Sequence, residues 1–326
     1  MKICLISFDF WHYDEHIVKK LNEKGIEACH INIGAFTHKN SGERLKNTFS
    51  KVFLGKNLKY HKRQDFILES LEKIGRQDQI LVINPEAIEE RIHQKIREYT
   101  DRNIAYLYDS VARNPVKHLL HYFDTIFSFD DEDVKNFGFE KITNYNYLEY
   151  LPAAKQHPKL DLFYITSHDK KRLSILNTLI NKLEPLNIKF EVITAGKKSW
   201  KNQLIQIFDT KNIEILKFRT KNIPHHSLPY YYKNTKVILD LMRSNQTGLS
   251  FRIFEAMALE KKIIADNPAI KNYDFYNPEN ILILNEDFSN IEKDFFENPY
   301  QKLPDEVYYK YTLDNWVNKI FNLEKK

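Results

Sequence analysis

The sequence predicts an α/β protein built from two doubly wound, Rossmann-like domains. Short apolar runs alternate with amphipathic segments along the chain, which is the pattern of parallel strands joined by helices. The alternation lapses between residues 145 and 160, where Pro152 and Pro158 interrupt it. The 326 residues also exceed what one core usually fills. We therefore expect one domain at 1–150 and a second at 151–326, facing each other across a cleft.

The first half contains five apolar runs that read as strands, at 3–7, 26–33, 80–83, 104–108 and 125–129. The segment between 34 and 63 is polar and irregular. Gly25 and Gly138 each close a helix, and Asn84-Pro85-Glu86 opens one. The helices expected between these strands lie at 15–23, 66–74, 85–99, 115–122 and 130–136.

The second half repeats this alternation without sequence similarity to the first half. Strands are expected at 162–165, 189–194, 213–218, 237–241, 262–265 and 281–284. Helices are expected at 171–183, 204–208, 228–233, 249–259, 291–296 and 312–321. The last helix carries Trp316, Ile320 and Phe321, and we expect it to pack back on the N-terminal domain.

Composition narrows the class of protein. No run of about eighteen apolar residues exists, so no membrane-spanning helix is expected. The two cysteines lie in predicted strands and read as free thiols in a reducing cytoplasm. The net charge of +5 is partly local, because Lys46 to Arg63 is rich in basic and aromatic residues. This stretch is either a solvated loop or a contact with the anionic inner membrane face; nucleic acid ranks last, because no recognised binding motif accompanies the charge.

The stretch from 236 to 267 organises the second half as strand, loop, helix and strand. Its largely apolar helix carries two charges, Arg252 and Glu255, which share one face. Gly248 and Ser250 stand at the helix start, where unpaired backbone N–H groups attract phosphate. This pattern favours a nucleotide, with its pyrophosphate beside Arg252 and its ribose on Glu255. The alternative is an ion pair between the two charges within the helix.

The segment SNQTGLSFRIFEAMALEKKIIADN, followed shortly by NYDFYNPENILIL, resembles part of the bacterial capsule and lipopolysaccharide glycosyltransferases of the GT-B fold. In the first half, IAYLYDSVARNP and FDTIFSFDDEDVKNFGF are similar to the N-terminal domain of the same enzymes. The resemblance extends over most of the chain. It implies a GT-B fold and transfer of a hexose-type sugar from a nucleoside diphosphate, UDP in most such enzymes, to a surface-glycan acceptor.

The resemblance also implies where the donor binds. Many of these enzymes carry two glutamates; Glu255 matches the second, which holds the ribose, whereas the first falls eight positions earlier on Thr247. This departure leaves retention or inversion at the sugar open. The nucleotide base is held by backbone at positions that correspond to Arg219 and Ile223. The donor set is Thr247, Gly248, Leu249, Ser250, Arg252, Glu255, Arg219 and Ile223.

Glycosyl transfer requires stabilisation of the leaving diphosphate and, for inversion, a base for the acceptor hydroxyl. Lys171 and Arg172 follow the first strand of the second domain and either add positive charge there or begin a solvated helix. Three residues on loops after first-domain strands are candidate bases, namely His12, Asp14 and Asp109. Asp14 and Asp109 have an alternative use as caps of a helix and a turn.

Other site chemistries are less well supported. Asp131-x-Asp133 resembles a manganese-binding motif of another glycosyltransferase fold, but these carboxylates begin a short helix, where negative charge is favoured. The chain has no zinc-type Cys/His cluster, so we expect no metal and no cofactor besides the donor. A nucleotide-sugar 2-epimerase and a non-catalytic nucleotide- or sugar-binding protein remain as alternatives.

Overall fold

The computed structural model describes residues 1–9, 12–35, 58–148, 158–167, 169–195, 216–219, 223, 227–243 and 246–323. For 58, 59, 170 and 216–219 it describes the backbone alone. The chain divides into two compact units, residues 1–143 with 313–326 and residues 144–312. The boundary therefore lies at residue 143, not at 150. The predicted helix at 204–208 and most of the basic stretch, 46–57, lie outside the described residues.

The first unit is a parallel sheet with strand order β2-β1-β3-β4-β5-β6. The strands are β1 Lys2–Ser7, β2 Glu27–Asn32, β3 Gln77–Ile83, β4 Thr100–Leu107, β5 Thr125–Ser128 and β6 Glu140–Lys141. The α-helices are α1 Asp14–Glu23, α3 Leu58–Ile74, α4 Glu90–Glu98, α5 Asp131–Phe137 and α12 Leu313–Phe321. Two 3-10 helices, η1 Pro85–Ala87 and η2 Lys117–Tyr122, replace parts of the α-helices predicted at 85–99 and 115–122.

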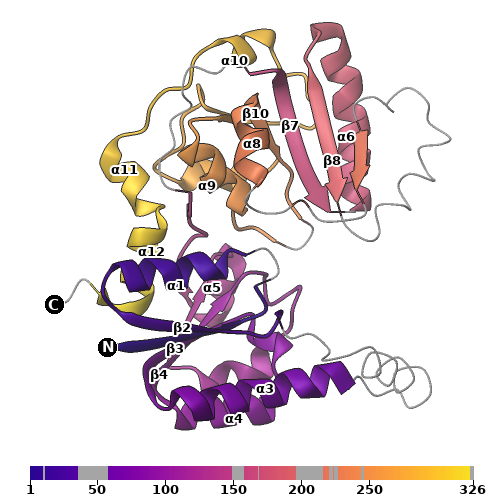
Figure 1. Ribbon diagram of the computed structural model, residues 1–326. Coiled ribbons are helices and arrows are strands. Elements are labelled where there is room, and N and C mark those ends of the chain that lie inside the picture. Colours follow the sequence, from indigo (N-terminus) through magenta and orange to yellow (C-terminus); the bar gives the residue numbers. More distant parts are fainter. Residues whose placement is uncertain are drawn as a thin grey trace. The chain divides into compact units, whose positions relative to one another are not determined.

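Helices cover both faces of this sheet, with α1 and α12 on one face and α3 and α4 on the other (Figure 1). β1 is buried on both faces from Ile3 onward, as its continuous apolar run predicts. The C-terminal helix α12 is integrated into this unit. Arg102 donates to the carbonyl of Ile320 at 2.9 Å, and the ring of Trp316 packs edge-on against Tyr106 at 5.1 Å.

The second unit is also a parallel sheet, with strand order β12-β11-β10-β7-β8-β9. The strands are β7 Leu160–Ser167, β8 Phe190–Ala195, β9 Leu216–Arg219, β10 Thr235–Asp240, β11 Lys262–Ala265 and β12 Ile281–Ile283. The α-helices are α6 Lys170–Leu183, α8 Leu228–Lys233, α9 Phe251–Ala258, α10 Lys293–Glu297 and α11 Asp305–Lys310, with 3-10 helices η3 Glu184–Leu186 and η6 Pro268–Asn272.

One apolar cluster of this unit lies beneath α9 and includes Phe163, Ile253 and Phe254, whereas another lies beneath α6 and includes Leu176 and Leu179. The two clusters pack on opposite faces of the sheet, as the doubly wound prediction requires. The strand, helix and strand predicted between 236 and 267 are β10, α9 and β11, and β10 and β11 are parallel neighbours.

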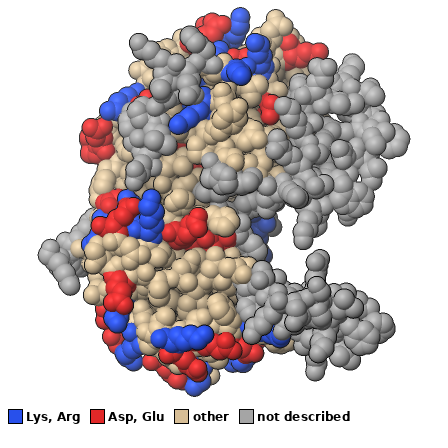
Figure 2. Space-filling model, in the orientation of Figure 1, with Lys and Arg blue, Asp and Glu red and all other residues tan. Residues whose placement is uncertain are grey.

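None of the helices in the described part of the chain is long and apolar enough to cross a membrane. On the face drawn in Figure 2, basic and acidic side chains of the described residues are interspersed. Ion pairs among the described residues include Lys95–Glu98 and Arg97–Asp124.

Candidate active site

The strand orders place one switch point in each sheet. In the first unit the chain proceeds from β1 to β2 on one side and later to β3 on the other; in the second unit β8 and β10 flank β7 in the same way. Loops that leave adjacent parallel strands in opposite directions open a crevice at the carboxyl ends of those strands, where ligands of doubly wound sheets bind. The predicted site residues can therefore be judged by their position relative to these two edges.

In the second unit, Arg252 reaches back from α9 to the end of β10. Its Nε and Nη2 atoms lie 2.8 and 2.7 Å from Oδ1 of Asp240, and its guanidinium lies over the ring of Tyr164. Burial alone would lower the pKa of Arg252, but the attraction of Asp240 outweighs it and raises the pKa, so the cation is permanent. Arg252 thus pairs with Asp240, which the sequence predicts only as part of a strand.

Side-chain hydrogen bonds to its backbone carbonyl groups hold the loop before α9 in place. Asn267 donates to the carbonyl of Thr247 and Asn144 to the carbonyl of Leu249, each at 2.9 Å. The hydroxyl of Ser250 donates to Asp240 at 2.8 Å and so does not cap the helix, although Ser250 occupies the N-cap position. The start of α9 is therefore held in place without the side-chain cap that would otherwise satisfy its N–H groups.

Arg172 lies on the other side of the switch point, in the first turn of α6. Its side chain is 4% exposed, its Nη1 donates to the hydroxyl of Thr166 at 3.1 Å, and its Nε is buried without a hydrogen-bond partner. Among the described residues no carboxylate forms an ion pair with Arg172. A buried guanidinium with one neutral partner is costly unless an anion joins it. Arg172 and Arg252 both contribute to the electrostatic environment of Tyr164, so they lie near the same point.

Glu255 faces the interior instead. It is fully buried, and its two carboxylate oxygens accept hydrogen bonds from the hydroxyls of Tyr147 at 2.7 Å and Tyr232 at 3.0 Å. These tyrosines come from the segment before β7 and from α8, so Glu255 joins three parts of the unit. The ribose contact that the resemblance implies for Glu255 stays a prediction, since it requires at least one tyrosine to yield its place.

The remaining predicted donor residues lie in different parts of the second unit. Gly248 is buried beside Leu249 in the clamped loop. Lys171 is exposed. Burial raises the pKa of Asp266, and the charge of Lys171 offsets part of that increase. Ile223 belongs to the apolar cluster beneath α9. Arg219 ends β9, but its side chain lies outside the described residues.

In the first unit, two neighbouring carboxyl groups follow β1. Burial and the repulsion of Asp9 raise the pKa of Asp14 to about 7. Tyr108 donates a hydrogen bond to Asp14 at 2.6 Å, which offsets part of this increase. Burial also raises the pKa of Asp9. The Asp9 Oδ1 atom accepts the backbone N–H of Asp14 at 3.0 Å, whereas its Oδ2 atom is buried without a hydrogen-bond partner. Asp14 is 2% exposed, so an acceptor hydroxyl cannot reach it easily.

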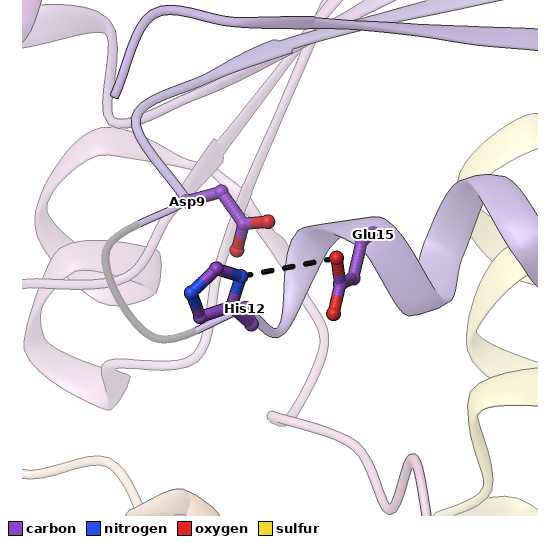
Figure 3. Close-up of side chains that lie close together, drawn as sticks. All are labelled: Asp9, His12 and Glu15. Carbon is purple, nitrogen blue, oxygen red and sulfur yellow. Dashed lines mark ion pairs between the residues drawn. The ribbon is translucent and has the colours of Figure 1, made fainter. Parts of the chain in front are cut away.

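His12 is the accessible member of this loop. Its side chain is 61% exposed, and its Nδ1 atom lies 3.8 Å from Oε2 of Glu15 (Figure 3). The backbones of His12 and Asp9 are left-handed, with φ of 59° and 41°, a conformation that few residues other than glycine adopt. Of the three candidate bases, His12 therefore combines the best exposure with an adjacent carboxylate.

Asp109 follows β4, where Arg113 and Asn114 contact its two carboxylate oxygens at 3.3 and 3.4 Å. Asn114 also donates to Glu86, whose pKa is raised to about 7 by burial and by the charge of Asp109. Glu86 is not among the predicted site residues, because Asn84-Pro85-Glu86 reads as a helix start in the sequence. The signal available was its position directly after a buried strand beside the switch point.

The acidic cluster at the start of α5 has structural uses. Asp130 caps the helix by accepting from the backbone of Glu132 and Asp133, and Asp133 accepts from the backbone of Val111 at 2.9 Å. Asp131 pairs with Lys141. The carboxylates of Asp131-x-Asp133 are thus engaged separately.

No protein-family model matches the sequence, and no curated protein sequence matches it. The fold is nevertheless similar to solved structures along essentially its whole length. An alpha-glucosyltransferase in complex with UDP has a TM-score of 0.64 at 12% identity, covering 100% of both chains. The apo lipopolysaccharide outer core galactosyltransferase WaaB has a TM-score of 0.58 at 12% identity, covering 99% of this chain and 100% of that one. A Methanocaldococcus jannaschii UDP-GlcNAc 2-epimerase in complex with UDP-GlcNAc and UDP has a TM-score of 0.53 at 14% identity, covering 99% and 100%. These similarities confirm the predicted GT-B fold.

Proposed function

We propose that the protein is a glycosyltransferase that moves a sugar from a UDP-linked donor to a surface-glycan acceptor, such as a capsule or lipopolysaccharide precursor. The observation that carries the proposal is the pair of arginines at the switch point of the second unit. Arg172 is buried without a carboxylate partner among the described residues, and Arg252 lies in the first turn of a helix whose start has no side-chain cap. The presence of UDP or a UDP-sugar in structures of the same fold supports this use of the edge.

In the proposed reaction, the bond between the anomeric carbon and the diphosphate breaks while the acceptor oxygen forms a new bond to that carbon. The leaving diphosphate gains negative charge, which Arg172, Arg252 and the N–H groups at the start of α9 stabilise. This arrangement requires no metal ion, so we expect activity to survive EDTA. An inverting reaction also needs a base for the acceptor hydroxyl, and His12 is the most exposed candidate, ahead of Asp109 and the buried Asp14.

A panel of nucleotide sugars with product analysis tests the proposal. UDP-glucose, UDP-galactose, UDP-GlcNAc and GDP-mannose are incubated with the protein and an extract of lipid-linked glycans. Transfer, or slow hydrolysis with release of the nucleoside diphosphate, is the expected result. Binding without turnover of any donor would contradict it. Duplex DNA serves as a further acceptor, because an alpha-glucosyltransferase of this fold has been seen in complex with DNA.

A nucleotide-sugar 2-epimerase is the second candidate, favoured by the similarity to the UDP-GlcNAc 2-epimerase. Epimerisation needs groups that exchange protons near neutral pH, and Asp14 and Glu86 have pKa values of about 7. The same assay separates the two functions. An isomerised sugar formed without any acceptor supports the epimerase, whereas a new glycosidic product supports the transferase.

We further propose that the protein works in the cytoplasm at the inner membrane face, where lipid-linked acceptors are elongated. The support is the basic and aromatic composition of Lys46 to Arg63. Co-sedimentation with vesicles that contain an anionic phospholipid, compared with neutral vesicles, tests this. Replacing Lys51, Lys56 and Lys62 by glutamine should abolish co-sedimentation, and unchanged binding would refute the role of this stretch.

A further inference from the structure

The loop after β1 brings together three metal-ligating side chains, Asp9, His12 and Glu15. One ligand atom from each lies within 4.8 Å of the others (Figure 3). An imidazole with two carboxylates is a donor set that suits first-row transition metal ions such as Zn²⁺ better than Mg²⁺, which prefers oxygen ligands and retains its water. We propose that this loop binds a divalent transition metal ion, represented by Zn²⁺, and that the bound ion prevents His12 from acting as a base.

The buried ligand is already oriented. Asp9 is 7% exposed, and its Oδ1 atom is fixed by the backbone N–H of Asp14. Its Oδ2 atom has no hydrogen-bond partner, and Figure 3 shows the carboxylate facing His12 and Glu15. A buried carboxylate oxygen with no donor loses free energy that a cation would restore. Oδ1 thus holds the carboxylate in place, whereas Oδ2 is the oxygen that can bind an ion.

The other two ligands can move to meet an ion. Zinc–ligand bonds are about 2 Å long, so the ligand atoms must close up by about 1 Å. His12 and Glu15 are 61% and 59% exposed, so their side chains can rotate without breaking a packed core.

The effect on His12 follows from imidazole chemistry. The atom that faces Glu15 is Nδ1, at 3.8 Å. A neutral imidazole bound to an ion through Nδ1 carries its proton on Nε2 and has no lone pair left to accept another. This consequence rests on the proposed function, in which His12 accepts the proton of the acceptor hydroxyl. The binding of the ion does not rest on it.

Binding is tested first, by titrating Co²⁺ into metal-free protein while recording its visible absorption, and Zn²⁺ by calorimetry. The wild type should bind one ion at this site, and Glu15→Gln should weaken that binding at least about tenfold, because it removes a ligand. The matched control is Glu23→Gln, which makes the same change at the other end of α1, where Glu23 pairs with Lys20. Equal affinity in Glu15→Gln and Glu23→Gln, or no binding by the wild type at millimolar ion, would overturn the proposal.

Inhibition is tested separately. Zinc should inhibit the wild type and the Glu23→Gln variant, and EDTA should restore both, whereas zinc should not lower the activity of Glu15→Gln below the level that this variant shows without zinc. Binding at this loop without inhibition of an active wild type would refute the effect on His12. If no donor is turned over at all, the proposed function fails, while the cobalt and calorimetric titrations still decide whether the metal site exists.

Discussion

The substitution Arg172→Ala distinguishes a ligand-binding guanidinium from a structural one. Arg172 is 4% exposed, donates to one neutral hydroxyl and has a buried Nε without a partner. Its removal leaves no carboxylate of the described residues unpaired and relieves the burial of a charge. We therefore expect the free energy of unfolding to stay within about 1 kcal/mol of the wild type or to rise. The nucleotide, in contrast, loses a charge-assisted hydrogen bond.

Such a bond contributes about 1.5–3 kcal/mol, so the Kd for UDP should rise about 10- to 100-fold. The weaker binding should also reduce the stabilisation by UDP that thermal or urea unfolding measures. At a UDP concentration of 100 times the wild-type Kd, the ligand stabilises the wild type by about 2.7 kcal/mol. A variant with a Kd about 30-fold higher gains only about 0.9 kcal/mol at that concentration.

Calorimetric titration with UDP and unfolding with and without UDP measure the two quantities independently. Lys182→Ala is the matched control, because Lys182 is an exposed cation in the last turn of the same helix. An unchanged Kd for UDP in Arg172→Ala would refute the phosphate role. A loss of about 3 kcal/mol of stability without nucleotide would show that the guanidinium is structural.

Three further predictions follow from buried groups. Arg252→Ala should lower the free energy of unfolding in urea by about 3–5 kcal/mol, because it leaves the 6%-exposed Asp240 carboxylate without its cation. Adding Asp240→Asn should recover part of that loss, and additive losses would contradict the pairing. The pKa of Asp14 is raised from 3.8 to about 7, so the folded state binds the proton more tightly and stability falls as pH rises from about 4 to 7. Asp14→Asn should reduce that slope and stabilise the protein at pH 8 by an amount on the order of 3 kcal/mol, and parallel pH profiles for the two proteins would disprove the shift. Trp316→Ala should destabilise the first unit by about 3–5 kcal/mol, because Trp316 is only 2% exposed and its ring packs against Tyr106. The amide hydrogen exchange rate of β4 should rise accordingly, and an unaltered rate would contradict the packing.

The strands and the central stretch were predictable because they depend on local patterns. Continuous apolar runs mark strands buried on both faces, and the turn residues before α9 mark its start. Elements with weak local signals were missed, such as the two-residue strand β6 and the helix α11. The helix predicted at 115–122 is a 3-10 helix, because periodicity does not fix the hydrogen-bonding pattern of a short segment.

Site residues were predictable as types but not as partners. Arg252 and Glu255 share a helix face, which suggested one joint role, yet Arg252 contacts Asp240 and Glu255 contacts two tyrosines. These partners come from other elements, and Tyr147 lies 108 positions from Glu255 in the sequence. No pattern within one segment reports such a contact. The buried Nε of Arg172 was equally inaccessible to sequence reasoning.

The place of α12 in the first unit affects how the protein is made. Gln79 of β3 donates to the carbonyl of Phe321, across 242 positions of sequence. A ribosome therefore releases the whole of the second unit before it supplies the helix that completes the first. The unit at 144–312 is continuous in sequence and can mature while its predecessor still exposes the apolar surface that Trp316 and Ile320 later cover. Chaperones that recognise nascent chains should bind this surface until α12 has left the ribosome.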